Sequence, residues 1–341
     1  MATVKKTIAI RGAGVVGLWQ ALLLARRGHA VTIYERAAEP FSEACSLYAG
    51  AMLAPRCEEE SAEAVIRDLG MRGIALWRET YPGTISNGSL VVTQARDRVL
   101  LDRFARMTSG YQKLDSAALA AIDPDLAKRV DGALCYADEA HVVPEPALRF
   151  LLDQSLAAGA TLRLGTADEP QAADIVVDCR GLAAQDVLPS LRGVRGERIV
   201  IRSKEVKISR PVRLLHPRFP LYVVPWGDGL YMIGATVIES QETGPISLRS
   251  ALELLTAAYA LHPAFGEAEI LMSGAGARPA FPDNRPRIID ANGYIYVNGL
   301  YRHGFLLAPV LAELVARFID TGEENAEVFG ADVFSADQRQ W

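Results

Sequence analysis

Apolar residues near the start of the chain form a short unbroken run and then fill most positions of a longer segment. Residues 7–10 read Thr-Ile-Ala-Ile and lead into a glycine-containing segment, which predicts a buried strand that ends in a turn. The apolar segment from about 15 to 27, closed by Gly28, predicts a helix, and residues 30–34 predict a second strand. This order of elements is typical of an α/β fold with a parallel sheet.

The pattern then changes twice along the chain. After a helical segment and a Tyr-Pro-Gly turn, the apolar runs become short and strand-like; helices and strands alternate again from residue 144, and from about 194 strands dominate. The expected elements are helices at 61–80, 97–107, 116–121, 144–159, 247–261 and about 307–320, strands at 88–93, 132–136, 160–164, 174–178 and 294–297, and a hairpin of 221–225 with 230–234.

These alternations predict two domains, each built from separate pieces of the chain. The nucleotide-binding domain is expected to consist of residues 1–80, 141–190 and 285–341. The second domain, an α+β unit on an antiparallel or mixed sheet, is expected to consist of 81–140 and 191–284. In such an arrangement a long ligand can lie across the interface between the domains.

The turn after the first strand has the spacing G-x-G-x-x-G, with Gly12, Gly14 and Gly17 at the three glycine positions. The first glycine permits the tight turn, the second leaves room for a pyrophosphate, and the third lets the helix pack closely on the strand. The first residues of the helix, Val15 and Val16, would offer free N–H groups at the positive end of the helix dipole. We therefore expect a dinucleotide at this turn.

An acidic residue at the end of the second strand narrows the choice of dinucleotide. Glu35 lies 18 positions after Gly17 and is placed to accept hydrogen bonds from a ribose diol. Its charge would repel the 2′-phosphate of NADP, even with Arg36 adjacent. NAD and FAD share this motif, and a long flavin that lies across two discontinuous domains fits the layout better than a compact NAD domain.

Composition excludes several classes of function. The chain has 341 residues, of which 50% are hydrophobic and 23% are charged, as is ordinary for a folded protein. A net charge of −5 and a pI near 5.7 argue against nucleic acid or an anionic membrane as partner. No apolar run reaches the ~18 residues that a membrane span requires. The start Met-Ala-Thr-Val-Lys-Lys leads directly into the first strand, so we expect no signal peptide and a cytoplasmic location.

Cysteine and histidine spacing argues against a metal site or a redox dithiol. The four cysteines show no C-x-x-C spacing, and the five histidines are dispersed. Buried free thiols are the simpler interpretation. Any redox chemistry is therefore expected to come from an organic cofactor.

Three further segments carry a family resemblance. Residues 45–55 read Cys-Ser-Leu-Tyr-Ala-Gly-Ala-Met-Leu-Ala-Pro, residues 274–286 contain Gly-Ala-Arg-Pro, and residues 298–309 contain Tyr-Arg-His-Gly-Phe-Leu-Leu-Ala-Pro. In order and spacing they resemble the flavin-dependent amine oxidases of the D-amino acid oxidase superfamily, and within it the glycine oxidases of the thiamine pathway. The resemblance covers nearly the whole chain. It implies a glutathione-reductase-type, Rossmann-like FAD-binding fold, non-covalent FAD and a small amino-acid substrate.

By position in this family, three residues meet the substrate. Arg278, expected just after a strand, would anchor the substrate carboxylate because a guanidinium matches it in two parallel hydrogen bonds. Tyr222 would donate its hydroxyl to the same carboxylate, and Arg302 would lie beside flavin and substrate. The implied cofactor-binding residues are Gly12, Gly14, Val15, Val16, Gly17, Glu35, Arg36, Cys45, Ser46, Gly50, Ala51, Met52, Gly181, Tyr301, Arg302, His303, Gly304, Phe305 and Leu306.

Several details depart from the family pattern or remain open. His303 replaces the usual asparagine and is expected just outside direct contact with the substrate. Arg180, in a triplet that normally has small residues, could meet a phosphate or only solvent. A hairpin near 165–174 is almost deleted, which leaves the adenine-side contact around 165–168 open. A helix that begins near Leu307 would direct its positive end at the pyrimidine side of the flavin.

The implied reaction is the oxidative deamination of glycine or a small (D-)amino acid. Hydride transfer to the flavin and hydrolysis of the imine would give a 2-oxo acid and ammonia, and O₂ would be reduced to H₂O₂. One alternative is a dehydrogenase of the same fold, acting on a D-amino acid or N-methylated amine, that passes electrons to a quinone or carrier protein. Another is a non-catalytic FAD-binding assembly factor, against which Arg278 and Tyr222 argue. Relatives are often tetramers, so a homo-oligomer is compatible with the resemblance.

Overall fold

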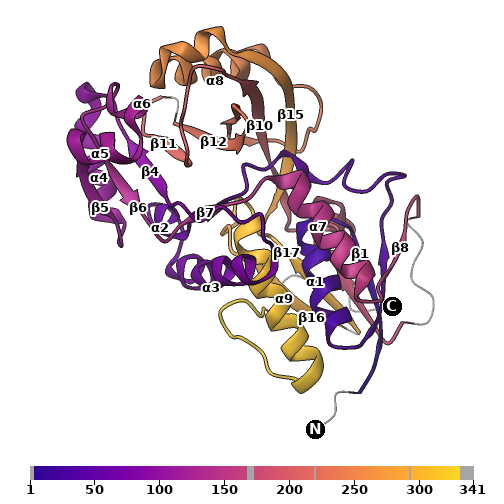
Figure 1. The fold of residues 1–341 in the computed structure, drawn as a ribbon. Helices are drawn as coiled ribbons and strands as arrows, with labels where there is room; N and C mark the ends of the chain where they lie inside the picture. Colours follow the sequence, from indigo (N-terminus) through magenta and orange to yellow (C-terminus); the bar gives the residue numbers. More distant parts are fainter. Residues whose placement is uncertain (1–3, 167–172, 219, 292, 331–341) are drawn as a thin grey trace.

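Six strands from distant parts of the chain form a mostly parallel sheet (Figure 1). The computed structural model describes residues 4–166, 173–218, 220–291 and 293–330. Neighbouring strands in this sheet are parallel except for the pair β16–β17 at one edge. In order across the sheet, the strands are β16 (Arg287–Ala291), β17 (Tyr294–Asn298), β9 (Ile175–Asp178), β1 (Thr7–Arg11), β2 (Ala30–Tyr34) and β8 (Thr161–Arg163).

The strand order reverses at β1, which pairs with β2 on one side and β9 on the other. The strand β2 follows β1 through helix α1 (Val15–Arg26), whereas β9 belongs to a much later segment. In open α/β sheets, ligands bind in the crevice beyond the carboxyl ends of the strands at such a reversal. The strand, turn, helix and strand that the sequence predicts at the N-terminus are confirmed.

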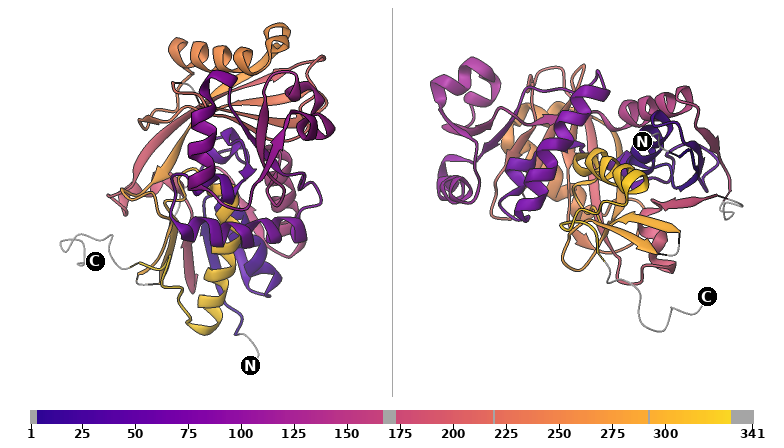
Figure 2. Two further views of the ribbon diagram at one scale, coloured as in Figure 1. Left: turned by 90° about the vertical axis from the view of Figure 1, so that its left-hand side faces the viewer. Right: turned by 90° about the horizontal axis from the view of Figure 1, so that it is seen from below.

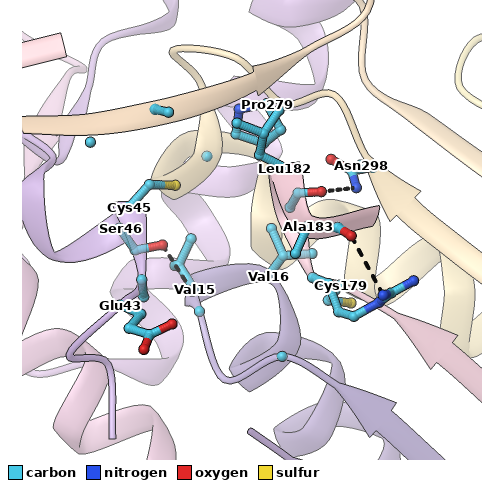
Figure 3. Close-up of a pocket in the computed structure, with 18 of the residues that line it drawn as sticks. Val15, Val16, Glu43, Cys45, Ser46, Cys179, Leu182, Ala183, Pro279 and Asn298 are labelled. Carbon is cyan, nitrogen blue, oxygen red and sulfur yellow. Dashed lines mark hydrogen bonds between the residues drawn. The ribbon is translucent and has the colours of Figure 1, made fainter. Parts of the chain in front are cut away.

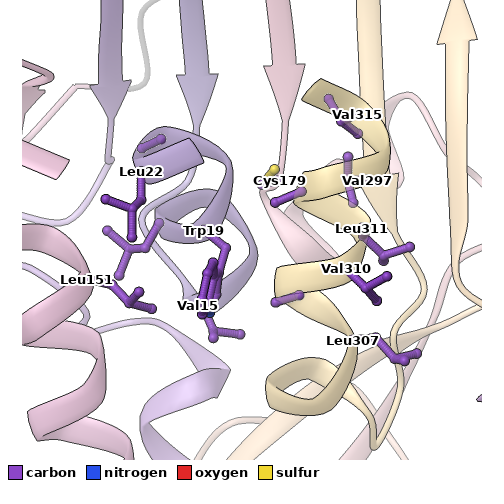
Figure 4. Close-up of a cluster of buried hydrophobic side chains, with 14 of the residues drawn as sticks. Val15, Trp19, Leu22, Leu151, Cys179, Val297, Leu307, Val310, Leu311 and Val315 are labelled. Carbon is purple, nitrogen blue, oxygen red and sulfur yellow. The ribbon is translucent and has the colours of Figure 1, made fainter. Parts of the chain in front are cut away.

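Helix α1 lies against two other helices, α7 (Pro144–Ala157) and α9 (Gly304–Thr321), and is buried nearly all round. Figure 4 shows Trp19 and Leu22 of α1 among the buried side chains that the neighbouring helices contribute. Helix α3 (Ala64–Thr80) packs on α9, where Trp77 Nε1 donates a hydrogen bond to the carbonyl of Phe305 over 2.6 Å. This buried bond fixes the first turn of α9.

Nine strands form a second, larger sheet that is antiparallel apart from the pair β11–β4. Eight of them follow one another, and β15 (Glu269–Ala280) pairs along β10. In order, the eight are β14 (Ile238–Glu239), β10 (Arg192–Arg202), β13 (Leu230–Gly234), β12 (Leu221–Gly227), β11 (Val212–Leu214), β4 (Ser89–Val92), β6 (Gly132–Tyr136) and β5 (Gln112–Asp115).

Helices at the periphery cover the larger sheet, and small elements lie between the two sheets (Figures 1 and 2). Helix α8 (Leu248–Leu261) contacts β10, β12 and β13, which confirms the helix predicted over that hairpin. The strands β3 (Met52–Leu53) and β7 (Ala140–His141) pair with each other beside α2 (Pro55–Glu58). The remaining helical segments are α4 (Arg98–Met107), α5 (Ser116–Ile122), α6 (Pro124–Ala127), η1 (Cys45–Tyr48), η2 (Ala95–Asp97), η3 (Gly181–Asp186) and η4 (Pro263–Glu267).

The structure corrects several boundaries that the sequence pattern predicts. Helix α9 begins at Gly304 rather than near Leu307, and the strand β15 continues to Ala280. Arg278 therefore lies within a strand. Glycines weaken the strand signal of β15, but its backbone pairs with β10 along most of its length. The elements β16 and α2 were not predicted either.

Candidate active site

A cavity of about 730 Å³ extends from the glycine turn after β1 to strand β15 (Figure 3). It is within the size range of about 300–1,000 Å³ that is usual for ligand pockets. Both sheets contribute to its walls, since β15 belongs to the larger one. The predicted cofactor-binding residues that line it are Gly12, Gly14, Val15, Val16, Glu35, Arg36, Cys45, Ser46, Gly181, Tyr301 and Gly304.

The glycine turn has the geometry that a nucleotide site requires. Gly12 has a φ of 96° and donates its N–H to the carbonyl of Tyr34 over 2.8 Å. Gly17 faces the carbonyl of Gly12 so closely that a side chain would collide with it. Gly14 has extended backbone, and a Cβ there would meet only Ser46 Oγ, at 3.4 Å. Of the three glycines, Gly14 is therefore the one that is open to the cavity.

The acid at the end of β2 fastens the glycine turn. The Glu35 carboxylate accepts hydrogen bonds from the N–H of Ala13 over 2.8 Å and from the N–H of Ala37 over 3.1 Å. Arg36 beside it forms an exposed ion pair with Glu43. Glu35 lines the cavity with its position fixed by the backbone.

Arg180, for which the sequence left two roles open, pairs with two acidic residues. Its guanidinium pairs with the buried carboxylate of Asp178 at 2.8 Å and with both carboxylate oxygens of Asp186, at 2.8 and 3.0 Å. Arg180 also lines the cavity, so it lies at the wall with two acidic partners. In the segment where the adenine-side contact was left open, Thr166 lines the cavity, whereas positions 167–168 lie outside the described residues.

The loop after β2 contributes several lining residues, Cys45 and Ser46 among them, and its later part is packed between the sheets. Ser46 Oγ accepts the N–H of Val15 over 3.2 Å, as Figure 3 shows. Gly50 packs against the side chain of Met232. Met52 begins β3 and packs against the hydrophobic cluster under β4 and β6 rather than lining the cavity. Between them, Ala51 has a φ of 50° and accepts the N–H of Val142.

The start of α9 forms another wall. The N–H of Tyr301 donates to the carbonyl of Pro279 over 2.9 Å, which ties this segment to β15. His303 precedes the helix and is buried, and burial, with a further contribution from the charge of Arg302, lowers the pKa of its imidazole to about 4. The ring is therefore neutral at neutral pH. The side chains of Phe305 and Leu306 lie in the core, so only their backbone could face a ligand.

Tyr222 and Arg302 meet at the junction of the two sheets. The Arg302 guanidinium donates a hydrogen bond to the hydroxyl of Tyr222 and forms an ion pair with Glu58 at 3.3 Å. Burial alone would raise the pKa of Glu58, but the charges of Arg302 and the neighbouring cations outweigh it, so the pKa is lowered and the group remains a carboxylate.

Arg278 is a partly buried cation with few partners. Its guanidinium lies directly against Gly196 of β10, and Nη1 donates to the carbonyl of Thr236 over 3.2 Å. Burial, reinforced by the like charge of Arg302, lowers the pKa of Arg278. No acidic side chain within the described ranges forms an ion pair with it. A partly buried guanidinium without an acidic partner is well suited to receive an external carboxylate.

Comparison with known proteins decides the family. The FAD dependent oxidoreductase family matches residues 7–318 of the chain. The chain belongs to this family. A Rhizobium etli protein, provisionally named as the thiamine biosynthesis oxidoreductase ThiO, is 50% identical over 322 residues, which cover 94% of this chain and 98% of that protein.

Two glycine oxidases extend the comparison. The enzyme of Geobacillus kaustophilus is 27% identical over 361 residues, which cover 93% of each protein. The crystal structure of the Bacillus cereus glycine oxidase superposes with a TM-score of 0.81 at 24% identity, covering 94% of this chain and 99% of that chain. At that identity the superposition shows a shared fold. The resemblance expected from the sequence is confirmed, and so is FAD as the cofactor.

The residues that this FAD-dependent oxidoreductase presents fit the cofactor. The cavity connects a glycine turn that is open at Gly14 with the start of a second helix at Gly304. Two helix N-termini therefore border one cavity, each with a partial positive charge. At the first of them the N–H of Val15, expected to be free, is bonded to Ser46. The first can hold phosphate oxygens and the second can stabilise negative charge on a reduced ring.

Two residues of this family member were missed by sequence reasoning. Glu58 is the first of three consecutive glutamates, a pattern that normally indicates a solvated surface. In the structure it is largely buried against Arg302. Arg213 lies directly opposite Tyr222 in the register of β11 and β12, with its guanidinium 5.5 Å from the centre of that ring. The sequence held no periodic signal for either residue.

Metal and membrane functions gain no support from the part of the chain that the structure describes. No group of His, Cys, Asp and Glu side chains there could hold a metal ion. Cys45 is partly buried and the other cysteines are buried, all as free thiols. Among the described residues, no helix combines the length and apolarity needed to cross a membrane.

Proposed function

We propose that this chain oxidises glycine or another small amino acid at its α-amino group, with non-covalent FAD as cofactor. The observation that carries the proposal is the partly buried guanidinium of Arg278, which has no acidic partner among the described residues and lies near Arg302. An amino-acid carboxylate would supply the missing anion. The names of the Rhizobium etli and Geobacillus kaustophilus relatives support the same substrate class.

The chain's residues would act chiefly by binding and orientation. Arg278 would hold the substrate carboxylate in two hydrogen bonds, and the hydroxyl of Tyr222 would add a third. Glu58 stays ionised and would attract the amino end of the substrate. When bound, FAD supplies the two-electron acceptor for oxidation of the amine. We also propose that residues 1–80, 141–190 and 285–341 hold the cofactor and that 81–140 and 191–284 complete the substrate side.

The electron acceptor distinguishes the proposal from its alternatives. As an oxidase, the protein would produce a 2-oxo acid, ammonia and H₂O₂ from substrate, water and O₂. A dehydrogenase would instead deliver the electrons to a quinone or carrier protein. An assembly factor that binds FAD without catalysis would leave Arg278 without a ligand.

The test is to mix the purified holoprotein with glycine, sarcosine or D-alanine, with and without air. We expect the yellow flavin to bleach without air in the presence of at least one of these amines. Admitting air should then restore the colour and produce one H₂O₂ for each flavin that is reoxidised. Bleaching that air does not reverse would indicate a dehydrogenase. A flavin that none of the amines reduces would contradict the proposed activity.

A further inference from the structure

Three consecutive residues of the short helix α2 are each held by a different charged group. Arg56 Nε contacts the Asp138 carboxylate at 3.1 Å, and the N–H of Cys57 donates to Glu139 over 2.9 Å. Glu58 pairs with Arg302 as described above. Asp138 and Glu139 belong to the turn between β6 and β7, so this turn holds α2 just before the residue that reaches the site.

Glu139 is the buried member of this arrangement. Its side chain is fully buried and also accepts hydrogen bonds from Cys57 Sγ over 3.3 Å and from the hydroxyl of Ser89. On the other side of Cys57, Arg213 Nη1 donates a hydrogen bond to the Cys57 carbonyl over 3.1 Å. The backbone of Cys57 is thus held between a carboxyl group at its N–H and a guanidinium at its carbonyl. Such a buried polar network rigidifies the segment it holds.

We propose that Glu139 is a positioning residue, which fixes Glu58 against Arg302 through Cys57 and thereby sets the affinity of the site for a carboxylate. The inference rests on the proposed function, and it adds Arg302 to Arg278 and Tyr222 as a group that the substrate carboxylate would contact. Glu58 and an external carboxylate compete for the same guanidinium. Any change that loosens α2 should weaken the internal pair and favour the external ligand.

Acetate, which carries the carboxylate but no amine, is the probe for this coupling. Its dissociation constant can be measured on the holoenzyme from the change it causes in the visible flavin spectrum. We expect Glu58→Gln to tighten acetate binding by at least about fivefold, in line with the coupling of close charge pairs. Glu139→Gln should tighten it by about threefold in the wild-type background and leave it unchanged in the Glu58→Gln background.

The pH profile supplies a readout that a merely structural role would not move. The charged and titratable groups around Glu139 are Cys57, Asp138, Tyr136, Cys135 and, through Cys57, Arg213. Burial raises the pKa of Glu139 to about 7, whereas the pKa of Cys57 lies well above its usual range. Protonation of the Glu139 carboxylate should mimic the Glu139→Gln substitution. Acetate should therefore bind more tightly as the pH falls from 8 to 6. The glutamine variant should show no such step.

A matched control comes from the opposite face of the sheet. Glu197 is also a buried carboxylate, paired with Arg195 at 2.7 Å and bonded to the N–H of Ser247. Glu197→Gln should lower the thermal stability without changing acetate binding. The wild-type pH profile needs no variant and keeps the test valid if Glu139→Gln does not fold.

The outcomes separate the two proposals. If Glu139→Gln changed the dissociation constant of acetate equally in the wild-type and Glu58→Gln backgrounds, or in neither, the positioning role would be overturned. The proposed function would remain intact. A flat wild-type pH profile between 6 and 8 would do the same. Failure of acetate to compete with glycine in the wild-type enzyme would instead count against the proposed function itself.

Discussion

Gly14→Val should yield a folded protein that has lost its flavin. The backbone at Gly14 is extended, a conformation that valine adopts readily, and a Cβ there meets only Ser46 Oγ at 3.4 Å. The isopropyl group would instead enter the cavity where a pyrophosphate must approach the turn. We expect colourless protein with a circular dichroism spectrum close to wild type and a lower melting temperature, because the stabilising ligand is absent.

The neighbouring glycines provide the control for this expectation. Gly12 has a φ of 96°, which valine rarely adopts, and any side chain at Gly17 would collide with the carbonyl of Gly12. Valine at either position should therefore impair folding itself, as measured by soluble yield and melting temperature. A yellow, fully active Gly14→Val protein would show that the turn after β1 is not the phosphate site.

The nucleotide-binding part of the fold could be predicted because its signals are local. The strand, turn, helix and strand from β1 to β2 follow from apolar runs and three glycines, and each has a single structural interpretation. The hairpin of β12 and β13 and the helix α8 were predictable for the same reason. Burial on both faces makes such strands continuous apolar runs, which a single sequence displays plainly.

The substrate side was harder to predict because its geometry depends on contacts between distant segments. Arg278 lies in a glycine-rich strand whose pairing with β10 has no local signature, and the sequence pattern placed it after a strand. Glu58 lies in a run of glutamates that looks like a solvated surface. Its role depends on Arg302, which lies far along the chain between β17 and α9. Only the tertiary fold brings these charges together.

The family motifs predicted the approximate position of the start of α9 but not the residue at which the helix begins. The sequence predicts that the helix begins near Leu307, whereas in the structure it begins at Gly304. The reason is tertiary: Phe305 is stacked on Trp77 with ring centres 5.9 Å apart, and the carbonyl of Phe305 accepts the indole N–H. These contacts stabilise the first turn more than the glycine disfavours it.

Arg278→Lys should reduce kcat/KM for the amino-acid substrate by about 10- to 150-fold and leave the flavin spectrum unchanged. The guanidinium lies against Gly196 with one backbone acceptor and no acidic partner within the described residues, so its other N–H groups remain available to a ligand. Lysine keeps the charge but loses the planar fork. One lost charge-assisted hydrogen bond costs roughly 1.5–3 kcal/mol, which corresponds to that range of rates.

A second arginine, on the strand that pairs with β15, is the matched control for this substitution. Arg192 of β10 lies opposite Ala280 and forms a partly exposed ion pair with Glu239 at 2.6 Å. Arg192→Lys should therefore leave kcat/KM within about twofold of wild type, because exposed pairs of this kind contribute little. Steady-state kinetics with glycine, sarcosine and D-alanine measure both variants. If Arg278→Lys kept wild-type values with every substrate that the enzyme oxidises, the carboxylate anchor would have to lie elsewhere, with Arg302 as the next cation to test.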